Sequence, residues 1–156
     1  MMNQAAELSV RKTITVQASP ERAFEVFAEQ IGSWWPFAGK SIGTAEAETA
    51  VLEPRAGGRW FERGVDGSEC EWGRVLAYEP PERLLLDWQI GADRSYDPEL
   101  HTDVEVRFVA EGEGTRVELE HRGLDAFGEQ AGQMQAIFDS PEGWGEILGA
   151  YAAAVA

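Results

Sequence analysis

Apolar and polar residues alternate near the start of the chain, between Val10 and Gln17. A period of two is typical of a strand that lays one face against a hydrophobic core. The next residues, Ser19-Pro20-Glu21, combine an N-cap side chain, a proline suited to the first helical turn and an acid near the helix start. They predict a helix that ends near Gly32 and buries Ala23, Phe24, Val26 and Phe27.

The middle of the chain consists of short apolar segments separated by turn residues. We expect strands over residues 44–53, 59–64, 69–78, 83–90, 102–110 and 115–122. Most of the connections have hairpin length, so consecutive strands should pair antiparallel.

The end of the chain has the pattern of a long helix. Ser140-Pro141-Glu142 repeats the start signal of the first helix. An apolar stripe then follows at helical spacing, formed by Trp144, Ile147, Leu148, Tyr151 and Val155. A shorter helical stretch is expected over residues 127–138.

These elements predict an α+β fold, in which a curved antiparallel sheet of six to seven strands wraps around the C-terminal helix. Small helices follow the first strand. One helix covers only part of a concave sheet, so a cavity of ligand size should remain between them. We expect residues 1–8 to be an N-terminal tail and residues 9–156 to form a single domain.

Composition restricts what this protein can bind. The chain has 13 Lys and Arg against 28 Asp and Glu, and a net charge of -15 repels nucleic acids and anionic membranes. The single cysteine, Cys70, leaves no intrachain disulfide and no thiolate metal cluster. No apolar run matches a signal peptide or a membrane span, so we expect a cytoplasmic protein without membrane insertion.

Several short sequences carry a family resemblance, in order along nearly the whole chain. They are residues 18–24, 54–60 and 80–84, Trp88, residues 113–117 with His121, and Gly143-Trp144. On these the chain resembles the START-like (SRPBCC) superfamily of helix-grip proteins. Within it, the chain is most similar to the branch named after the C-terminal domain of the activator of heat-shock-protein-90 ATPase.

The resemblance implies a sheet that grips a C-terminal helix over a cavity. Members of the superfamily bind lipids, steroids or aromatic polyketides, and some are catalysts, so fold alone does not assign a chemistry. The chaperone-activating function belongs to a larger protein with a further domain, and we do not transfer it. No cofactor is expected.

Strand parity and the helical stripe place many aromatic side chains toward the cavity. The expected wall is Trp34, Trp35, Phe37, Trp60, Trp72, Trp88, Phe108, His121, Trp144, Leu148 and Tyr151. The alternative is that each of these simply fills the core.

The sequence Trp34-Trp35-Pro36-Phe37 predicts a gate or a contact surface at one end of the cavity. Adjacent tryptophans cannot both point inward from one regular element, so at least one should be partly exposed or line an opening. Packing of this segment on the final helix is the alternative.

Two ionisable residues are weak catalytic candidates. Glu62 shares a strand face with Trp60, which would bury its carboxylate and raise its pKa or pair it with Arg74 or Arg107. His121 lies on the apolar face of its strand, where it could move protons, or could be a hydrogen-bonded core histidine.

The longest connection, residues 91–101, is expected to be a flexible lid. Asp97, His101 and the following Asp103 are residue types that bind metals, but their spacing matches no established site. Solvated surface is the favoured interpretation, and no metal is expected.

Three functions fit these observations. The preferred one is non-catalytic binding of an apolar, aromatic or lipid-like small molecule in the cavity. A polyketide cyclase or aromatase would need Glu62, His121 or an inward arginine beside the ligand. A protein-interaction module of the co-chaperone kind would use acidic faces and exposed tryptophans such as Trp34 or Trp35, and a protein partner or a homodimer stays open.

Overall fold

The fold is built on one antiparallel sheet of seven strands. The computed structural model describes residues 8–38 and 40–156, so the tail expected over residues 1–8 lies outside the described residues except for Leu8. The strands are β1 (Ser9–Val16), β2 (Ala47–Leu52), β3 (Arg59–Gly64), β4 (Glu69–Glu79), β5 (Arg83–Trp88), β6 (Thr102–Glu111) and β7 (Gly114–Arg122). They lie in the order β1-β7-β6-β5-β4-β3-β2, and every neighbouring pair is antiparallel. The predicted sheet and fold class are confirmed.

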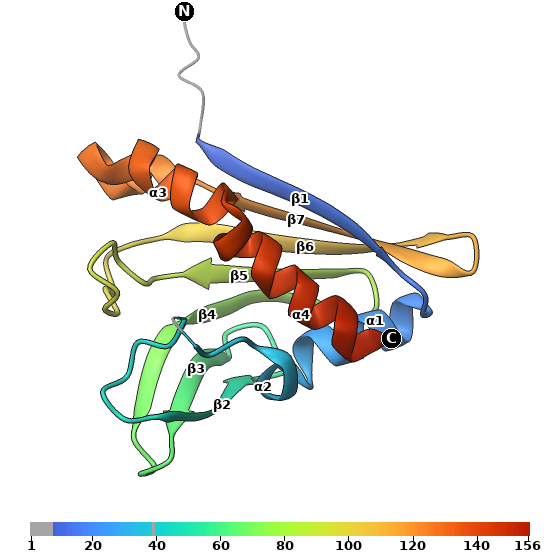
Figure 1. Ribbon diagram of the computed structural model, residues 1–156, viewed down its shortest axis with the longest axis horizontal. Helices are drawn as coiled ribbons and strands as arrows, with labels where there is room; N and C mark the ends of the chain where they lie inside the picture. Colours follow the sequence, from blue (N-terminus) through green and yellow to red (C-terminus); the bar gives the residue numbers. More distant parts are fainter. Residues whose placement is uncertain (1–7, 39) are drawn as a thin grey trace, which may run out of the picture.

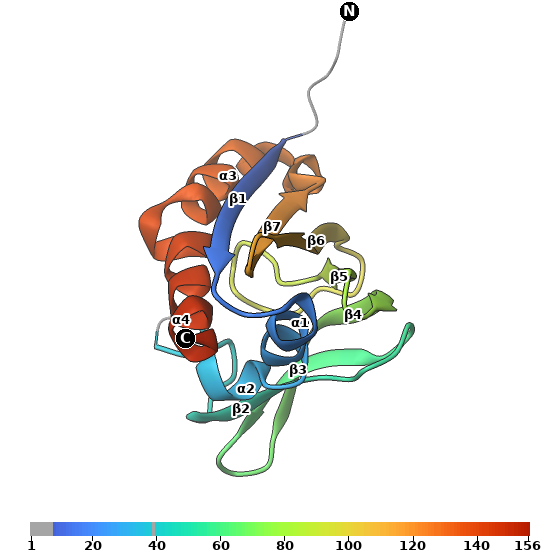
Figure 2. The same cartoon turned by 90° about the vertical axis from the view of Figure 1, so that its right-hand side faces the viewer.

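The helices cover one face of this sheet. They are α1 (Pro20–Ala28), α2 (Ile31–Trp34), the 3-10 helix η1 (Leu124–Gln130), α3 (Ala131–Asp139), the π-helical turn η2 (Pro141–Gly145) and α4 (Glu146–Val155). Figures 1 and 2 show α3 and α4 crossing the concave face, with α1 and α2 beside the C-terminal end of α4. None of the helices in the described part of the chain is long and apolar enough to span a membrane.

The sheet bends most in its β2–β5 half. Each pair of strands in this half has a register shift, between Ala47 and Thr49 in β2, between Trp60 and Phe61 in β3, and along β4 after Val75. An extra residue on one strand bends that strand and increases the local twist. These shifts turn β2, β3 and β4 away from the plane of β5–β7, as Figure 1 shows.

The first helix begins as predicted but ends earlier. The Ser19 side chain accepts a hydrogen bond from the Arg22 backbone N–H, at 3.2 Å, which caps the helix start. The helix ends at Ala28 rather than near Gly32, because Gln30 leaves the helical conformation (φ -110°, ψ 23°). The chain then enters α2 in a new direction.

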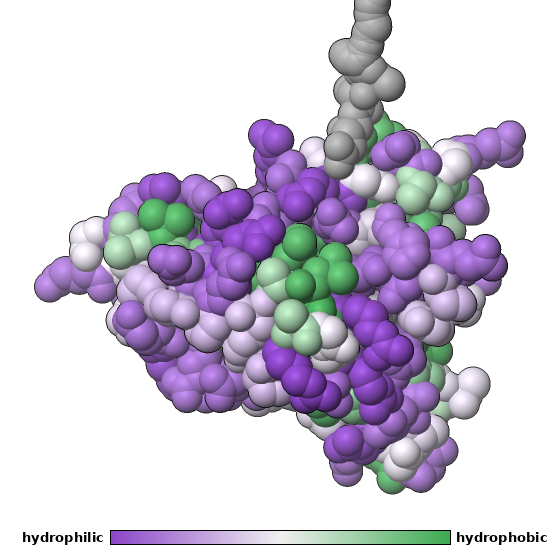
Figure 3. Space-filling view, turned by 180° about the vertical axis from the view of Figure 1, so that it is seen from behind, coloured by the Kyte–Doolittle hydropathy of each residue, from purple (hydrophilic) through white to green (hydrophobic). Residues whose placement is uncertain are grey.

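The outer face of the sheet is mostly hydrophilic, with a small apolar area near its centre (Figure 3). Arg83, Arg107 and Arg122 all pair there with the largely buried carboxylate of Glu105. The apolar side chains of the sheet therefore gather on the opposite, concave face, which faces the helices.

The C-terminal helical segment is kinked, which differs from the prediction of one helix starting at Pro141. Regular α-helix begins only at Glu146, because Gly143 is not helical (φ -90°, ψ -123°). A Cβ on Gly143 would lie 2.4 Å from the backbone oxygens of Ile137 and Phe138. Only glycine allows the turn to approach the end of α3 so closely.

We therefore expect Gly143→Ala to destabilise the protein by about 1–3 kcal/mol, because the added methyl collides with backbone that cannot rotate away. The matched control is Gly149→Ala in α4, where a Cβ meets no atom within 4 Å. That change should stabilise the protein by about 0.4–1 kcal/mol. Urea unfolding of both variants measures the difference, and equal free energies of unfolding would contradict the role of the kink.

Candidate ligand-binding cavity

A cavity of about 300 Å³ lies between the sheet and the C-terminal helices. Its wall takes side chains from the α2–β2 loop, β4, β5, the β5–β6 loop, α3, η2 and α4. Four indole rings contribute, those of Trp35, Trp72, Trp88 and Trp144. Further apolar side chains come from Ile42, Ile90, Met134, Phe138 and Ile147. The cavity occupies the position that the sequence analysis expected for it.

The four indoles pack against one another as well as against the cavity. The ring centroids of Trp35 and Trp72 lie 4.9 Å apart, and those of Trp88 and Trp144 lie 5.6 Å apart. Trp35 also meets Trp144 edge to face at 6.4 Å. All four residues are less than a tenth exposed. Mutual packing fixes the ring orientations, so the wall offers preformed aromatic faces and edges.

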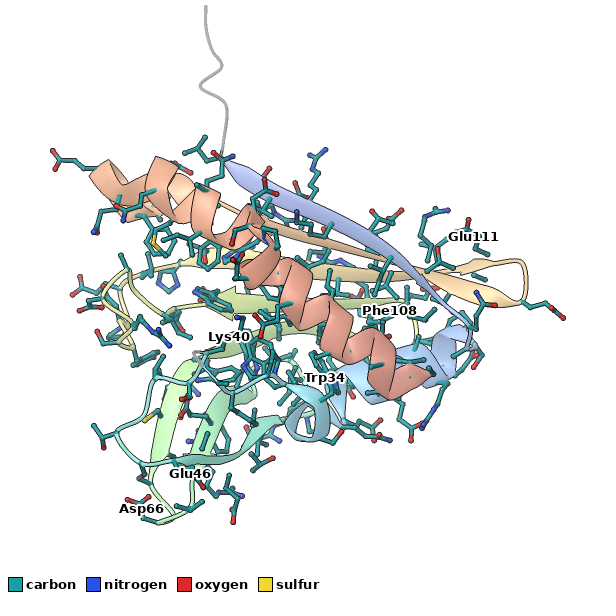
Figure 4. The ribbon with its side chains drawn as sticks, viewed as in Figure 1. Trp34, Lys40, Glu46, Asp66, Phe108 and Glu111 are labelled. Atoms are coloured by element: carbon teal, nitrogen blue, oxygen red, sulfur yellow. The ribbon has the colours of Figure 1, made fainter. Side chains whose placement is uncertain are left out.

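Three charged residues, Lys40, Arg94 and Glu142, complete the lining. The ammonium group of Lys40, labelled in Figure 4, lies 3.0 Å from a carboxylate oxygen of Glu146 on α4. Arg94 Nη2 donates to the backbone oxygen of Ser41 at 3.1 Å and so links the two loops that border the cavity. Arg94 and Glu142 are exposed, so their charges lie at the open side of the cavity. The buried part of the cavity wall is aromatic and aliphatic.

Sequence reasoning missed most of the lining outside the tryptophans. The missed residues are Lys40, Ile42, Ile90, Gly91, Ala92, Arg94, Met134, Ile137, Phe138, Glu142 and Gly143, and Ile147 was assigned to the helical stripe only. Most of them lie on irregular connections or on α3, where neither a period of two nor a period of 3.6 indicates which side chains point inward.

Seven of the predicted cavity residues lie in the packed core beside the cavity and not on its wall. They are Trp34, Phe37, Trp60, Phe108, His121, Leu148 and Tyr151. Trp60 packs edge to face on Trp72 and Trp88, while Phe108 packs on Phe24 and Phe27. The Tyr151 hydroxyl donates to the Ala23 backbone oxygen at 2.7 Å, and burial raises the pKa of this phenol. Of the seven, Trp34, Trp60 and His121 pack directly on aromatic side chains of the wall.

The sequence analysis expected Trp34 or Trp35 to be partly exposed or to line an opening; neither is partly exposed, and of the two Trp35 lines the cavity. Their exposed fractions are 6% and 5%. Trp34 is the last residue of α2, whereas Trp35 is extended (φ -58°, ψ 128°), so the two side chains do not leave one regular element. Trp34 turns toward α1, where its indole N–H donates to the Val26 oxygen at 2.8 Å, and Trp35 turns toward the cavity.

Glu62 is buried as predicted, but neither Arg74 nor Arg107 is its partner. The backbone N–H groups of Ile42 and Gly43 donate to its two carboxylate oxygens at 2.8 and 3.1 Å, and the Trp72 indole donates to one of them at 2.9 Å. Arg74 pairs with Glu71, and Arg107 pairs with Glu105. Glu62 thus holds the α2–β2 loop and Trp72 in place, and it does not line the cavity.

His121 is a hydrogen-bonded core histidine. The Trp144 indole donates to Nδ1 at 3.1 Å, so Nε2 carries the proton and donates to Thr102 Oγ1 at 2.9 Å. Burial lowers the pKa of His121 from its ordinary value of 6.5 to about 3. The imidazole is therefore neutral at physiological pH, and both ring nitrogens are already used inside the protein.

The acidic residues and His101 of the 91–101 loop are not grouped as metal ligands would be. His101 Nδ1 lies 2.7 Å from Asp87 Oδ2 on β5, and burial raises the pKa of Asp87 while the hydrogen bond with His101 offsets part of this rise. Among residues 8–38 and 40–156, no group of three or more His, Cys, Asp and Glu is placed to hold a metal. The loop contributes Gly91, Ala92 and Arg94 to the cavity wall, and its opening as a lid stays a prediction.

A family comparison agrees with this architecture. The family model for the Activator of Hsp90 ATPase homolog 1-like protein matches residues 17–156. The chain belongs to this family. The resemblance expected from residues 18–24, 54–60 and 80–84 is confirmed.

Solved structures with this fold include the anthrahydroquino-gamma-pyrone synthase Txn09. It is 38% identical over 95% of this chain and 96% of that chain, with a TM-score of 0.65. The self-sacrificing resistance protein CalC from Micromonospora echinospora is 27% identical, with 94% and 93% of the two chains covered and a TM-score of 0.67. Protein MLL2253 from Mesorhizobium loti, at 18% identity with 93% and 94% covered and a TM-score of 0.67, shares the fold. A search of curated proteins found no match.

The neutral His121 makes stability depend on pH. Below pH 6.5 the unfolded chain binds a proton that the folded chain does not, so the free energy of unfolding falls as the pH falls from 6.5 toward 3. The contribution of His121 should decrease by about 2 kcal/mol between pH 7.5 and 5, at about 1.4 kcal/mol per unit. Urea unfolding across this range is the measurement.

The His121→Gln variant retains one acceptor and one donor but does not titrate, so its stability should fall less steeply over the same range. The exposed His101 provides the control, because His101→Gln should keep the steep dependence of the native protein. Equal slopes for the native protein and His121→Gln would contradict a neutral buried imidazole.

Proposed function

We propose that this protein binds a planar, apolar aromatic small molecule in the cavity between the sheet and α4. The observation that carries the proposal is the cavity wall, which combines four buried indoles with seven aliphatic, thioether or phenyl side chains. A volume of about 300 Å³ is at the lower end for small-molecule sites. Flat rings would bury apolar area against this wall and gain edge-to-face contacts with the tryptophans.

An aromatic ligand fits this wall better than a flexible lipid chain. Trp35, Trp72, Trp88 and Trp144 present rigid flat surfaces, and a rigid ligand loses little conformational entropy on binding to them. The charged groups of Lys40, Arg94 and Glu142 lie at the opening, where polar substituents of the ligand would meet both protein and water.

The relatives support an aromatic ligand. The synthase Txn09, at 38% identity, is named for a fused-ring anthrahydroquinone-pyrone product. Both chains are covered almost completely, at 95% and 96%.

A second candidate function is catalysis on such a molecule, and the name of the 38% identical synthase favours it. Glu62 and His121, the candidates from the sequence, do not line the cavity, and their polar atoms are engaged by protein groups. Proton transfer would therefore use Lys40 or Glu142, the lining residues whose side chains can exchange protons. Product formed by the protein from an aromatic precursor, and lost in Lys40→Met or Glu142→Gln, would distinguish catalysis from binding.

The protein-interaction hypothesis invoked acidic faces and exposed tryptophans. Trp34 and Trp35 are buried, so the tryptophans give it no support. We do not propose it.

Titration of the native protein with 9-fluorenone, flavone, a steroid and oleate tests the proposal. Fused or linked aromatic rings should quench the tryptophan fluorescence saturably, because four of the six tryptophans line the cavity. Oleate should not. Absence of saturable binding for every aromatic compound would contradict the proposed function.

The binding site is located with a pair of variants measured by calorimetry. Ala92→Phe places a ring into the cavity from the β5–β6 loop and should weaken binding by about tenfold or more, since the ring competes for the same space. Val65→Phe adds the same ring at an exposed position between β3 and β4 and should leave the affinity unchanged.

A further inference from the structure

The indole N–H groups around the cavity differ in whether a protein group accepts a hydrogen bond from them. Three of the four lining tryptophans donate to a protein acceptor: Trp72 to Glu62 at 2.9 Å, Trp144 to His121 at 3.1 Å and Trp35 to the Lys40 backbone oxygen at 3.4 Å. Trp88 is only 8% exposed, yet its Nε1 has no hydrogen-bond partner among the described residues. A buried indole N–H without an acceptor is uncommon and costs its desolvation in full.

The surroundings of Trp88 explain why no protein group accepts from it. The rings of Trp60, His121, Phe138 and Trp144 lie around it, with centroids 5.2 to 5.7 Å from its own. Both nitrogens of His121 are already hydrogen-bonded. The Trp88 side chain also lines the cavity.

Trp60 provides a comparison for Trp88. Its indole N–H also has no hydrogen-bond partner in the described part of the chain, but Trp60 is 1% exposed and does not line the cavity. Of these two unpartnered indoles, only Trp88 belongs to a side chain that a bound molecule would touch.

We propose that the cavity selects aromatic molecules that carry a hydrogen-bond acceptor oxygen, such as an aryl ketone, a quinone or a pyrone, and that Trp88 Nε1–H donates to that oxygen. An indole N–H is only a donor, so the oxygen must accept. The inference rests on the proposed function and adds the feature that distinguishes one aromatic ligand from another. Trp88 is then a specificity-determining residue, whereas the other three lining indoles act through their rings.

The matched ligands 9-fluorenone and fluorene test this inference, because they share a flat fused-ring frame and differ by one carbonyl oxygen. Calorimetry of the native protein should show 9-fluorenone binding about five- to tenfold more tightly, the ratio expected for one net hydrogen bond. In Trp88→Phe this preference should fall to about one, since the phenyl ring retains aromatic contact but has no N–H.

Trp35→Phe is the matched control. It removes an indole from the same cavity, but that N–H already donates to the Lys40 backbone oxygen. Both ligands should bind more weakly to this variant, and the preference for 9-fluorenone should remain.

Nuclear magnetic resonance of the six indole N–H groups gives a second measurement on the native protein. The Trp88 indole proton should move downfield on addition of 9-fluorenone and much less on addition of fluorene, because a new hydrogen bond deshields it. Its signal is assigned from Trp88→Phe or, if that variant does not fold, by triple-resonance spectra of the native chain.

The outcomes separate the two proposals. Equal affinities for 9-fluorenone and fluorene, or equal losses for both in Trp88→Phe, would overturn the role of Trp88 while leaving aromatic binding intact. An unchanged Trp88 proton in the 9-fluorenone complex would do the same. If no aromatic compound binds, flavone included, the proposed function itself is wrong.

Discussion

The hydrogen bond from Trp144 Nε1 to His121 Nδ1 joins the C-terminal helical segment to the sheet. It continues from His121 Nε2 to Thr102 Oγ1, which donates in turn to the Trp88 backbone oxygen at 2.9 Å. This series of hydrogen bonds, the Trp144–Trp88 relay, connects η2, β7, β6 and β5. It requires a neutral imidazole with its proton on Nε2. It sets the separation between the rings of Trp88 and Trp144, which contribute to the same cavity wall.

Space remains beside this relay because the segments around it are held apart at specific points. The turn at Gly143 allows α3 and α4 to approach the sheet at different angles, so a straight helix does not fill the concave face. Glu62 holds the backbone of Ile42 and Gly43, and with it the loop that closes the opposite side. In the other half of the concave face, aromatic side chains such as Phe108 and Tyr151 pack the core without a comparable space.

The fold could be predicted because its signals are local and repeated. Strand alternation, the capped start at Ser19 and the stripe from Trp144 to Val155 each place a core-facing surface. The order from β2 to β7 follows the chain, whereas β1 pairs with β7 from the far end of the sequence. The four predicted residues that do line the cavity are all tryptophans, and Trp72 and Trp88 among them lie on strands. Lys40, Arg94 and Ile42 lie on loops whose course depends on tertiary contacts, and the burial of both Trp34 and Trp35 depends on where α2 ends.

Binding among the four indoles is tested most directly by isotope-filtered nuclear Overhauser spectra of the methyl-labelled protein with 9-fluorenone. Ring protons of a molecule inside the cavity should show contacts to the methyl groups of Ile90, Met134 and Ile147, which come from three separate segments of the wall. Contacts confined to exposed side chains outside the cavity, such as Val65 and Leu76, would contradict a ligand site between the sheet and α4.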